Sequence, residues 1–480
     1  MNTYMYIGGK QVGASDGAVS QNINPSTGAS IGTVPAATKE DIDRALAFAV
    51  EGQKEWAAVP LYERIEIVYR FCALAEERAE EIGRAACLEG GKLFREAVNE
   101  AKVMSYVFRA FAEGARNHYG VSMPRGTEPR VKDDVLFTVS EPLGIVACIV
   151  PFNFPLELYA HKVAPALLMG NAVIIKPSSY TPLAASIVTG LLIEAGVNPK
   201  AVQYVTGSGA KIGDWLTASP LVSAVSLTGG TAAAVHIIEK SASNIPRLFF
   251  ELGGNDPLVI FGDADVDLAV REAVGGRLTN AGQICCCSKR FIVHNSVREE
   301  FTKKLVDALG AVTPKDAMDA DAVMGPVVSE AAAEEIIRQI GKTVEQGAEC
   351  VLGGTREGAY VCPTVLTGVT PLMDISGEME IFGPVFPIIG FDTAEEALEI
   401  ANGTPYGLQG GVITADMKTA MKAAMELQCG AVVINGSGNY RSAHQPFGGY
   451  KLSGLGREGI LTTLDEMSQT KTISFKGILA

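Results

Sequence analysis

The spacing of hydrophobic and polar residues along this chain changes near residue 143. Before that point, apolar residues recur with the period of a helix, which predicts amphipathic helices over about 61–84 and 93–114. A capping box at Thr38–Asp41 predicts the start of an earlier helix. After that point, short runs rich in β-branched residues, such as GIVACIV and NAVIIK, alternate with helical stretches of about ten to fifteen residues. This alternation predicts βαβ units and a parallel sheet.

Two such alternating blocks follow one another along the chain. The boundary between them lies near residues 252–256, at ELGGN, and the second block runs from about 257 to 435. The segment 120–142 is extended and polar, which suits a projecting β-ribbon. The sequence therefore predicts an α/β chain with two domains and one small ribbon.

Charge and cysteine content exclude several classes of function. The formal net charge of −14 argues against a nucleic-acid partner or an anionic membrane, because both need clustered Lys and Arg. No apolar stretch is long enough to span a membrane, and the first residues lack the pattern of a secretory signal. The nine cysteines show no CxxC spacing, so we expect reduced thiols, a cytoplasmic location and no metal site.

Three residues carry candidate chemistry. Cys285, in NAGQICCCSKR, is predicted to open a helix, where backbone N–H groups favour the thiolate; the alternative is a triplet of buried structural cysteines. Glu251, in FFELGGNDP, is poorly placed for a surface ion pair and could activate water beside a cysteine. Asn153, in VPFNFPLE, either offers an amide donor at a strand end or stabilises a turn.

Two glycine-rich turns link predicted strands to helices. The segment 207–213, GSGAKIG, matches GxGxxG, but the acidic residue expected about twenty positions later is missing. The segment 228–231 reads TGGT. Each turn is either a phosphate site at a helix N-terminus or an ordinary tight turn.

Taken together, seven ordered runs resemble the aldehyde dehydrogenase superfamily over about residues 5–475. The runs are PFNFP, IIKPSSYTP, SLTGGT, ELGGNDP, GQICC, EIFGPVFP and PFGGYKLSGLGREG. The resemblance implies that Cys285 is the nucleophile, Glu251 the general base and Asn153 the oxyanion donor. Cys286 and Cys287 stand where the family is permissive, and a redox role for either stays open.

The resemblance also implies a nicotinamide cofactor and the residues that bind it. Ser179 stands where NAD-preferring relatives often carry an acidic residue that repels a 2′-phosphate, so we expect NADP to be accepted, alone or alongside NAD. At Gly230 many relatives have serine, so a hydroxyl contact to the phosphates is expected to be absent. The predicted cofactor residues are Phe152, Lys176, Ser179, Gly209, Gly213, Gly229, Gly230, Thr231, Leu252, Glu380 and Phe382.

The domain organisation implied by the resemblance is an α/β fold in three parts. A Rossmann-like cofactor domain with a parallel sheet spans 1–119 and 143–252, and an α/β catalytic domain spans 253–445. A small β oligomerisation ribbon spans 120–142 and 465–480, which implies a homodimer or homotetramer.

The substrate is expected to be a small aldehyde with a hydroxylated or anionic tail, such as lactaldehyde, a semialdehyde, or a phosphono- or sulfo-aldehyde. In relatives that act on succinic semialdehyde, a cation eight residues after the asparagine contacts the far carboxylate, and here His161 stands at that position. Arg109, Arg441 and His444 are further candidates for the same tunnel. Alternatively, His161 is a neutral helix residue and Arg109 a surface charge.

Two alternative functions remain. A CoA-acylating dehydrogenase would pass the acyl group to CoA instead of water, and a non-enzymatic relative would only share the fold. Members of the first kind often lack the ELGG glutamate, whereas proteins of the second kind tend to lose the cysteine or the base. This chain retains both Glu251 and Cys285.

Overall fold

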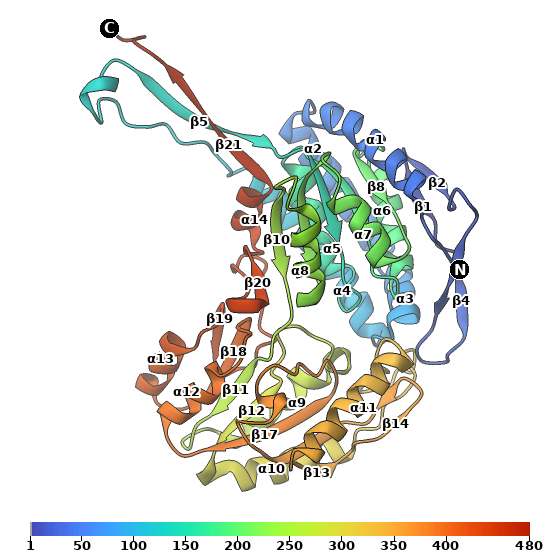
Figure 1. The fold of residues 1–480 in the computed structure, drawn as a ribbon, viewed down its shortest axis with the longest axis vertical. Helices are drawn as coiled ribbons and strands as arrows, with labels where there is room; N and C mark the ends of the chain where they lie inside the picture. The colour runs from blue at the N-terminus through green and yellow to red at the C-terminus, as the bar shows by residue number, and fades with distance from the viewer. Residues whose placement is uncertain (1) are drawn as a thin grey trace.

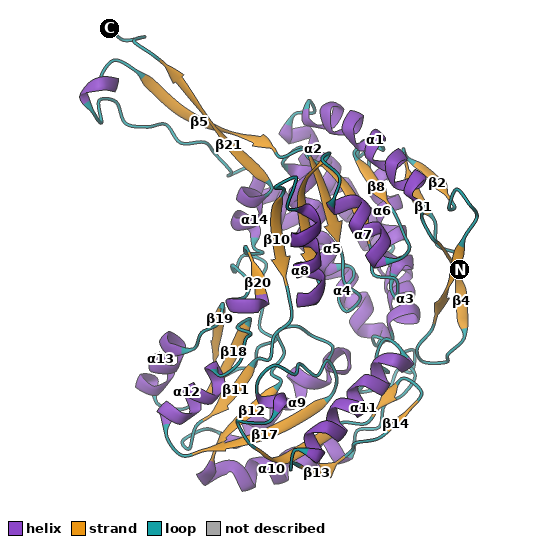
Figure 2. Cartoon of the chain, in the orientation of Figure 1, coloured by secondary structure: helices purple, strands orange, loops and turns teal. Residues whose placement is uncertain are grey.

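Two sheets, each with its own hydrophobic core, make up the body of the chain, and a two-stranded ribbon projects from it (Figure 1). The computed structural model describes residues 2–480. Helices pack against both sheets, as Figure 2 shows. This arrangement confirms the predicted α/β fold.

The first sheet has eight strands in the order β2-β1-β8-β7-β6-β9-β10-β20. The five strands from β8 to β10 are parallel, and β1, β2 and β20 extend the sheet antiparallel at its edges. The strands are β1 (Met5–Ile7), β2 (Lys10–Val12), β6 (Ile145–Ile149), β7 (Ala172–Lys176), β8 (Val202–Tyr204), β9 (Val222–Thr228), β10 (Arg247–Glu251) and β20 (Gly454–Leu455).

The strand order places a crevice between β6 and β9. The chain proceeds from β6 outward to β7 and β8, then returns to add β9 and β10 on the other side of β6. At such a reversal, the connections after neighbouring strands leave in opposite directions, and ligands bind outside the carboxyl ends of the strands. The ends of β6 and β9 therefore mark the expected cofactor site.

The helices of the first domain follow the predicted pattern with one difference. The capping box is present, because the Thr38 hydroxyl accepts from the Asp41 N–H and the Asp41 carboxylate accepts from the Thr38 N–H. The single helix predicted over 61–84 is wrong: Arg78 leaves helical geometry, with φ −102° and ψ 17°, and divides it in two. The helices are α1 (Lys39–Ala57), α2 (Leu61–Glu77), α3 (Ala79–Gly90), α4 (Phe94–Ala115), α5 (Glu157–Leu168), α6 (Pro182–Glu194), α7 (Gly209–Thr217) and α8 (Thr231–Ser241).

The second sheet has seven strands in the order β13-β16-β17-β12-β11-β18-β19, all parallel except β13. Its strands are β11 (Pro257–Ile260), β12 (Arg290–His294), β13 (Glu349–Leu352), β16 (Thr364–Val369), β17 (Val385–Phe391), β18 (Gln409–Ile413) and β19 (Ala431–Ile434). Its helices are α9 (Val266–Leu278), α10 (Asn295–Gly310), α11 (Glu330–Glu345), α12 (Ala394–Asn402) and α13 (Met417–Glu426).

Short elements complete the fold. Two further strand pairs are β3 (Val19–Ile23) with β4 (Ser30–Pro35), and β14 (Arg356–Glu357) with β15 (Tyr360–Val361). Four single turns of 3-10 helix are η1 (Pro129–Val131), η2 (Thr279–Gly282), η3 (Asp374–Ser376) and η4 (Lys451–Ser453).

The C-terminal part of the chain returns to the first domain before it enters the ribbon. The predicted domain boundaries do not cover 446–464, and this segment contributes β20 to the first sheet and α14 (Ile460–Glu466) to the first core. The ribbon pairs β21 (Ser468–Phe475) with β5 (Val135–Pro142) along their full length. In the described residues, no helix is both long and apolar enough to cross a membrane.

Candidate active site

A cavity of about 390 Å³ opens at the carboxyl ends of β6, β7, β9 and β10, where the strand order predicts a ligand site. It contains the three predicted catalytic residues and most of the predicted cofactor residues, whereas Gly209, Gly213 and Thr231 do not line it. The residues that line it are Ile149, Val150, Pro151, Phe152, Asn153, Lys176, Ser178, Ser179, Thr228, Gly229, Gly230, Glu251, Leu252, Gly253, Cys285, Glu380 and Phe382.

Cys285 lies on a turn between η2 and β12, and the prediction that it opens a helix is wrong. Three consecutive residues before it have left-handed backbone: Asn280 at φ 49°, Ala281 at φ 53° and Gly282 at φ 74°. This conformation costs about 1–3 kcal/mol at a residue such as Ala281, and such costs concentrate at functional sites. The left-handed segment reverses the chain after α9, so the thiol reaches the cavity from a loop without a helix N-terminus behind it.

The surroundings of Cys285 act on its thiol in both directions. The hydrogen bond with Cys286 and burial raise the pKa of Cys285 well above its usual value. The positive charges of Lys289 and Arg441 oppose that shift. Thiolate formation at this turn therefore depends on nearby cations instead of on a helix dipole.

Glu251 is the last residue of β10 and lines the same cavity as Cys285. Both of its carboxylate oxygens are buried, and neither has a hydrogen-bond partner in the described chain. Burial, followed by the negative charges of Cys285 and Glu458, raises the pKa of Glu251 well above its usual value. A carboxyl group with a raised pKa and free oxygens beside a nucleophile has the properties of a general base.

Asn153 follows β6 and connects to the nucleophile loop by two hydrogen bonds. Its Nδ2 donates to the Gln283 carbonyl at 3.0 Å, and its own carbonyl accepts from Asn280 Nδ2 at 3.0 Å. The buried carboxylate of Glu100, on α4, accepts from the N–H groups of Leu156 and Glu157 at 2.8 and 3.2 Å. Glu100 thereby fixes the start of α5 and the loop that carries Asn153.

The other end of the cavity suits a nucleotide. The Lys176 ammonium is buried at the end of β7, and burial lowers its pKa to about 8. The Thr228 hydroxyl is buried and has no partner among residues 2–480, and a Cβ at Gly230 would meet open space. At Gly253 a Cβ would lie 2.2 Å from the Glu380 carboxylate, so only glycine lets Glu380 approach the backbone this closely. The free Thr228 hydroxyl and the open space at Gly230, at the start of α8, fit a dinucleotide phosphate.

Three further charged side chains, Lys162, Arg441 and Glu458, form ion pairs near Glu251 and are buried or largely buried. The Glu458 carboxylate pairs with Lys162 at 3.2 Å and with Arg441 at 2.8 Å. Although burial alone would raise the pKa of Glu458, these two cations and His161 hold it below its usual value. The Arg441 guanidinium also covers the Phe447 ring at 4.1 Å and leaves its Nε without a partner in the described part of the chain.

The structure does not bring all four predicted substrate residues to the site. His161 is buried beside Lys162 and Glu251, and burial lowers its pKa to about 3, so its ring is neutral and offers no charged hydrogen bond. Arg109 lies on the exposed side of α4, where it pairs with Glu76 at 2.7 Å, and His444 is exposed. Of the four, only Arg441 places a largely buried cation, with 16% of its side chain exposed, close to the catalytic pair.

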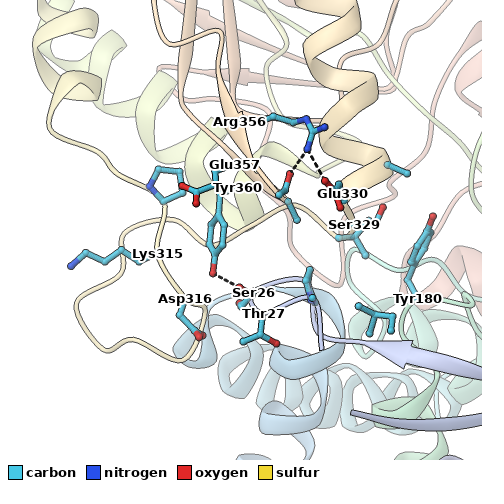
Figure 3. Close-up of a pocket in the computed structure, with 18 of the residues that line it drawn as sticks. Ser26, Thr27, Tyr180, Lys315, Asp316, Ser329, Glu330, Arg356, Glu357 and Tyr360 are labelled. Atoms are coloured by element: carbon cyan, nitrogen blue, oxygen red, sulfur yellow. Dashed lines mark hydrogen bonds and ion pairs between the residues drawn. The ribbon is translucent and has the colours of Figure 1, made fainter. Parts of the chain in front are cut away.

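A larger cavity of about 1400 Å³ lies elsewhere, between the β3–β4 hairpin and the second domain (Figure 3). The Tyr360 hydroxyl donates to the Ser26 carbonyl across it at 2.8 Å, and Arg356 pairs with Glu330 at 3.1 Å. It shares Ser179 with the first cavity but contains none of the predicted catalytic residues. Among the residues that the structure describes, no group of three or more His, Cys, Asp and Glu is arranged to hold a metal ion.

Comparison with known proteins agrees with this geometry. The model of the aldehyde dehydrogenase family matches residues 12–473. The chain belongs to that family. As an aldehyde dehydrogenase, it is an oxidoreductase that oxidises aldehydes with NAD(P). It is 35% identical over 477 residues to 3-sulfolactaldehyde dehydrogenase of Pseudomonas putida, covering 98% of this chain and 97% of that protein.

Solved structures resemble this aldehyde dehydrogenase over its full length. An NADP-dependent enzyme of E. coli superposes with a TM-score of 0.95 at 32% identity, covering 99% of this chain and 98% of that one. A betaine aldehyde dehydrogenase of Staphylococcus aureus with NAD+ bound has a TM-score of 0.95 at 33% identity, covering 99% and 97%. The cofactor class predicted from the sequence is confirmed.

Sequence reasoning missed the residues that support the catalytic trio. Glu100 and Lys162 resemble ordinary helix charges in the sequence, because their partners are distant along the chain, and Lys289 stands in the run NAGQICCCSKR without any sign of its contact with Glu380. Glu458 stands within the quoted run PFGGYKLSGLGREG, and that membership was its one signal.

Substitution of the three neighbouring cysteines tests which thiol the cavity uses. We expect Cys285→Ala to abolish dehydrogenase activity and to keep the fold and cofactor binding, because only Cys285 lines the cavity. Cys286→Ala and Cys287→Ala should each retain substantial activity. The measurement is NAD(P)H formation, with circular dichroism as the control for folding. Activity in Cys285→Ala together with loss in Cys286→Ala would show that the nucleophile is Cys286.

Proposed function

We propose that this enzyme oxidises a small aldehyde to the carboxylic acid, with Cys285 as nucleophile, Glu251 as general base and Asn153 as oxyanion donor. The observation that carries the proposal is that Cys285 and Glu251, from different domains, line one cavity at the carboxyl end of the first sheet. Water is the acyl acceptor in this scheme, because the carboxylate oxygens of Glu251 are free to receive its proton.

The first half of the reaction forms a covalent intermediate on sulfur. The Cys285 thiolate adds to the aldehyde carbon and gives a tetrahedral thiohemiacetal. The Asn153 amide and the Cys285 backbone N–H stabilise its oxyanion, and each donor of this kind contributes about 10²–10³ in rate. Bound NAD(P)+ supplies the hydride acceptor that the oxidation requires. Loss of hydride leaves a thioester on Cys285.

The second half releases the acid. Glu251 takes a proton from a water molecule, the resulting hydroxide attacks the thioester carbon, and the C–S bond breaks to release the acid and the Cys285 thiolate, while the proton stays on Glu251. A positioned base contributes about 10²–10⁴ to such a step. The raised pKa of Glu251 makes it a stronger base than a surface carboxylate, but it acts only in its deprotonated form.

We place the cofactor along the carboxyl ends of β6, β7 and β9. In this assignment Lys176 and Ser179 hold the adenosine ribose, the turn Gly229–Thr231 holds the phosphates, and Glu380 holds the nicotinamide ribose. Phe152 and Phe382, whose rings lie 5.9 Å apart, border the nicotinamide end together with Leu252. Gly209 lies beside Lys176, since its Cβ would be 3.9 Å from the ammonium, and with Gly213 it belongs to the adenosine side.

For the substrate, we propose a short aldehyde with an anionic or hydroxylated tail. Arg441 supports this, because its guanidinium lies close enough to influence the pKa of both Glu251 and Cys285, and its buried Nε has no hydrogen-bond partner among the described residues. The similar enzyme from P. putida acts on 3-sulfolactaldehyde, which carries a sulfonate and a hydroxyl. Arg441 therefore replaces His161 as the predicted anion-binding residue.

We assign a separate role to each domain. The first domain binds the cofactor, and the second carries the nucleophile.

We also propose that the β5–β21 ribbon joins copies of the chain into a homodimer or homotetramer. A two-stranded ribbon is marginally stable alone, and this one exposes apolar side chains such as Phe475. Nine unpaired cysteines suit a reducing compartment such as the cytoplasm.

The role of Glu251 is tested by Glu251→Gln. We expect a pre-steady-state burst of NAD(P)H followed by a very slow steady rate, since acylation proceeds and hydrolysis stalls. In the wild type the steady rate should rise with pH as Glu251 loses its proton, and the variant should lack that dependence. Turnover with and without added CoA is the control, and a wild type that needs CoA would contradict water as the acceptor. Unchanged turnover in Glu251→Gln would remove Glu251 from the mechanism.

Cofactor preference is tested at Ser179. We expect the wild type to turn over with NADP as well as NAD, because Ser179 leaves room and no negative charge beside the ribose. Ser179→Glu should raise the KM for NADP by at least about tenfold through repulsion of the 2′-phosphate, with little change for NAD. Steady-state kinetics with both cofactors measures this. Strict use of NAD by the wild type would show that other groups exclude the phosphate.

The substrate proposal is tested by comparing Arg441→Met with His161→Ala. In Arg441→Met, kcat/KM should fall more for an anionic aldehyde such as succinic semialdehyde than for a neutral aldehyde of equal length. The difference in lost transition-state stabilisation between the two substrates should be about 1.5–3 kcal/mol. His161→Ala should affect both substrates alike, because the ring is neutral. Equal losses for both aldehydes in Arg441→Met would contradict anion binding by Arg441.

A further inference from the structure

Lys289 is a buried lysine that lies four residues after Cys285. It directly contacts the turn Cys285–Cys287, which we call the nucleophile turn. Its side chain is 1% exposed. The ammonium donates to the Cys285 carbonyl and, at 3.4 Å, to the Cys287 carbonyl. One cation thus joins both ends of the turn that presents the thiol.

The same ammonium reaches the cofactor end of the cavity. Lys289 Nζ lies 3.3 Å from Glu380 Oε1. That oxygen also accepts from the Gly254 N–H at 3.2 Å, and the other carboxylate oxygen packs against Gly253. Glu380 and Cys285 line one cavity, so Lys289 connects the two from beneath its surface.

A buried ammonium needs compensation, and the surroundings of Lys289 supply it. Burial alone would lower its pKa, but the charges of Cys287, Glu380 and Asp256 raise it to about 12, so the side chain is cationic at every physiological pH. Asp256 is itself buried, and burial raises its pKa to about 7. Burying a charge with its partners rarely adds stability over apolar packing, so a fixed cation at this place is better explained by its effect on the site.

We propose that Lys289 is a positioning residue that fixes the nucleophile turn, supplies the positive field for the Cys285 thiolate, and orients Glu380 toward the cofactor. This proposal rests on the proposed roles of Cys285 and Glu380. In many proteins the N-terminus of a helix lowers the pKa of a reactive cysteine. The nucleophile turn has no such helix, and here the Lys289 ammonium lowers the pKa of the thiol instead.

The charge of Lys289 determines in which direction its removal shifts the pKa of Cys285. Lys289 lowers the pKa of Cys285, against the larger opposing influence of the Cys286 hydrogen bond and of burial. Removal of the ammonium leaves only Arg441 as a cation acting on the thiol among the influences identified above. The thiolate fraction at neutral pH should therefore fall.

The test compares Lys289→Met, which keeps the length of the side chain but removes its charge, with Lys303→Met, which removes a charge from an exposed pair on α10. Each protein, free of cofactor, is treated with iodoacetamide over a range of pH, and the label on the Cys285 peptide is measured by mass spectrometry. We expect alkylation of Cys285 in Lys289→Met to be slower by about tenfold at neutral pH, the effect of one pKa unit. Lys303→Met should behave as the wild type.

A second readout separates the two tasks of Lys289. The KM for the cofactor should rise in Lys289→Met, and the increase should vanish when Glu380→Gln is already present, because the two residues act in one contact. The slower alkylation should persist in that background. A purely structural role would lower stability without changing the alkylation profile of folded enzyme.

The proposal is overturned if folded Lys289→Met alkylates at Cys285 with the wild-type pH profile. If that variant does not fold, Lys289→Met/Asp256→Asn removes the uncompensated carboxylate as well and supplies the same measurement with the same two outcomes. Failure of the proposed function is distinguishable, since an active Cys285→Ala enzyme would refute the nucleophile and leave the effect of Lys289 on alkylation intact.

Discussion

The site depends on the contact between the loop after β6 and the turn that carries Cys285. Two hydrogen bonds link them, from Asn153 to the Gln283 carbonyl and from Asn280 to the Asn153 carbonyl. Each contributes about 1 kcal/mol to stability, and they act together with other contacts between the two domains, such as the hydrogen bond from the Asn280 N–H to Glu96. This contact joins the loop after β6 directly to the turn that carries the nucleophile.

Burial at that junction disfavours the charged forms of Glu251 and Cys285, and nearby cations partly offset this effect. Burial raises the pKa of both Glu251 and Cys285, so both the carboxylate and the thiolate are disfavoured. Arg441 offsets the cost at both residues, with Lys162 acting on Glu251 and Lys289 on Cys285. These cations come from three separate parts of the chain, so the balance arises only in the folded enzyme.

Secondary structure was predicted well where the periodicity of apolar residues was strong, and distinctive motifs identified residues that the structure brings together in one cavity. The parallel strands and the grouping of Asn153, Glu251 and Cys285 in one cavity are examples. The break at Arg78 was missed, because the apolar spacing continues through it. The helix expected at Cys285 is absent, because the left-handed residues 280–282 turn the chain first, and no local pattern distinguishes Ala281 from a helical alanine. The sequence left open whether His161 is a cationic substrate ligand or a neutral helix residue, because its ionisation depends on burial by distant residues such as Phe111.

The most direct test of the account is the identity of the atom that carries the acyl group. Glu251→Gln enzyme is mixed with aldehyde and cofactor, quenched in acid within the first turnover, and digested for peptide mass analysis. The account predicts a mass increase equal to the aldehyde less two hydrogens, on the peptide that contains Cys285, with fragmentation placing it at that residue and no adduct without cofactor. An adduct on Cys286 or Cys287, or burst formation of NAD(P)H with no adduct, would contradict it.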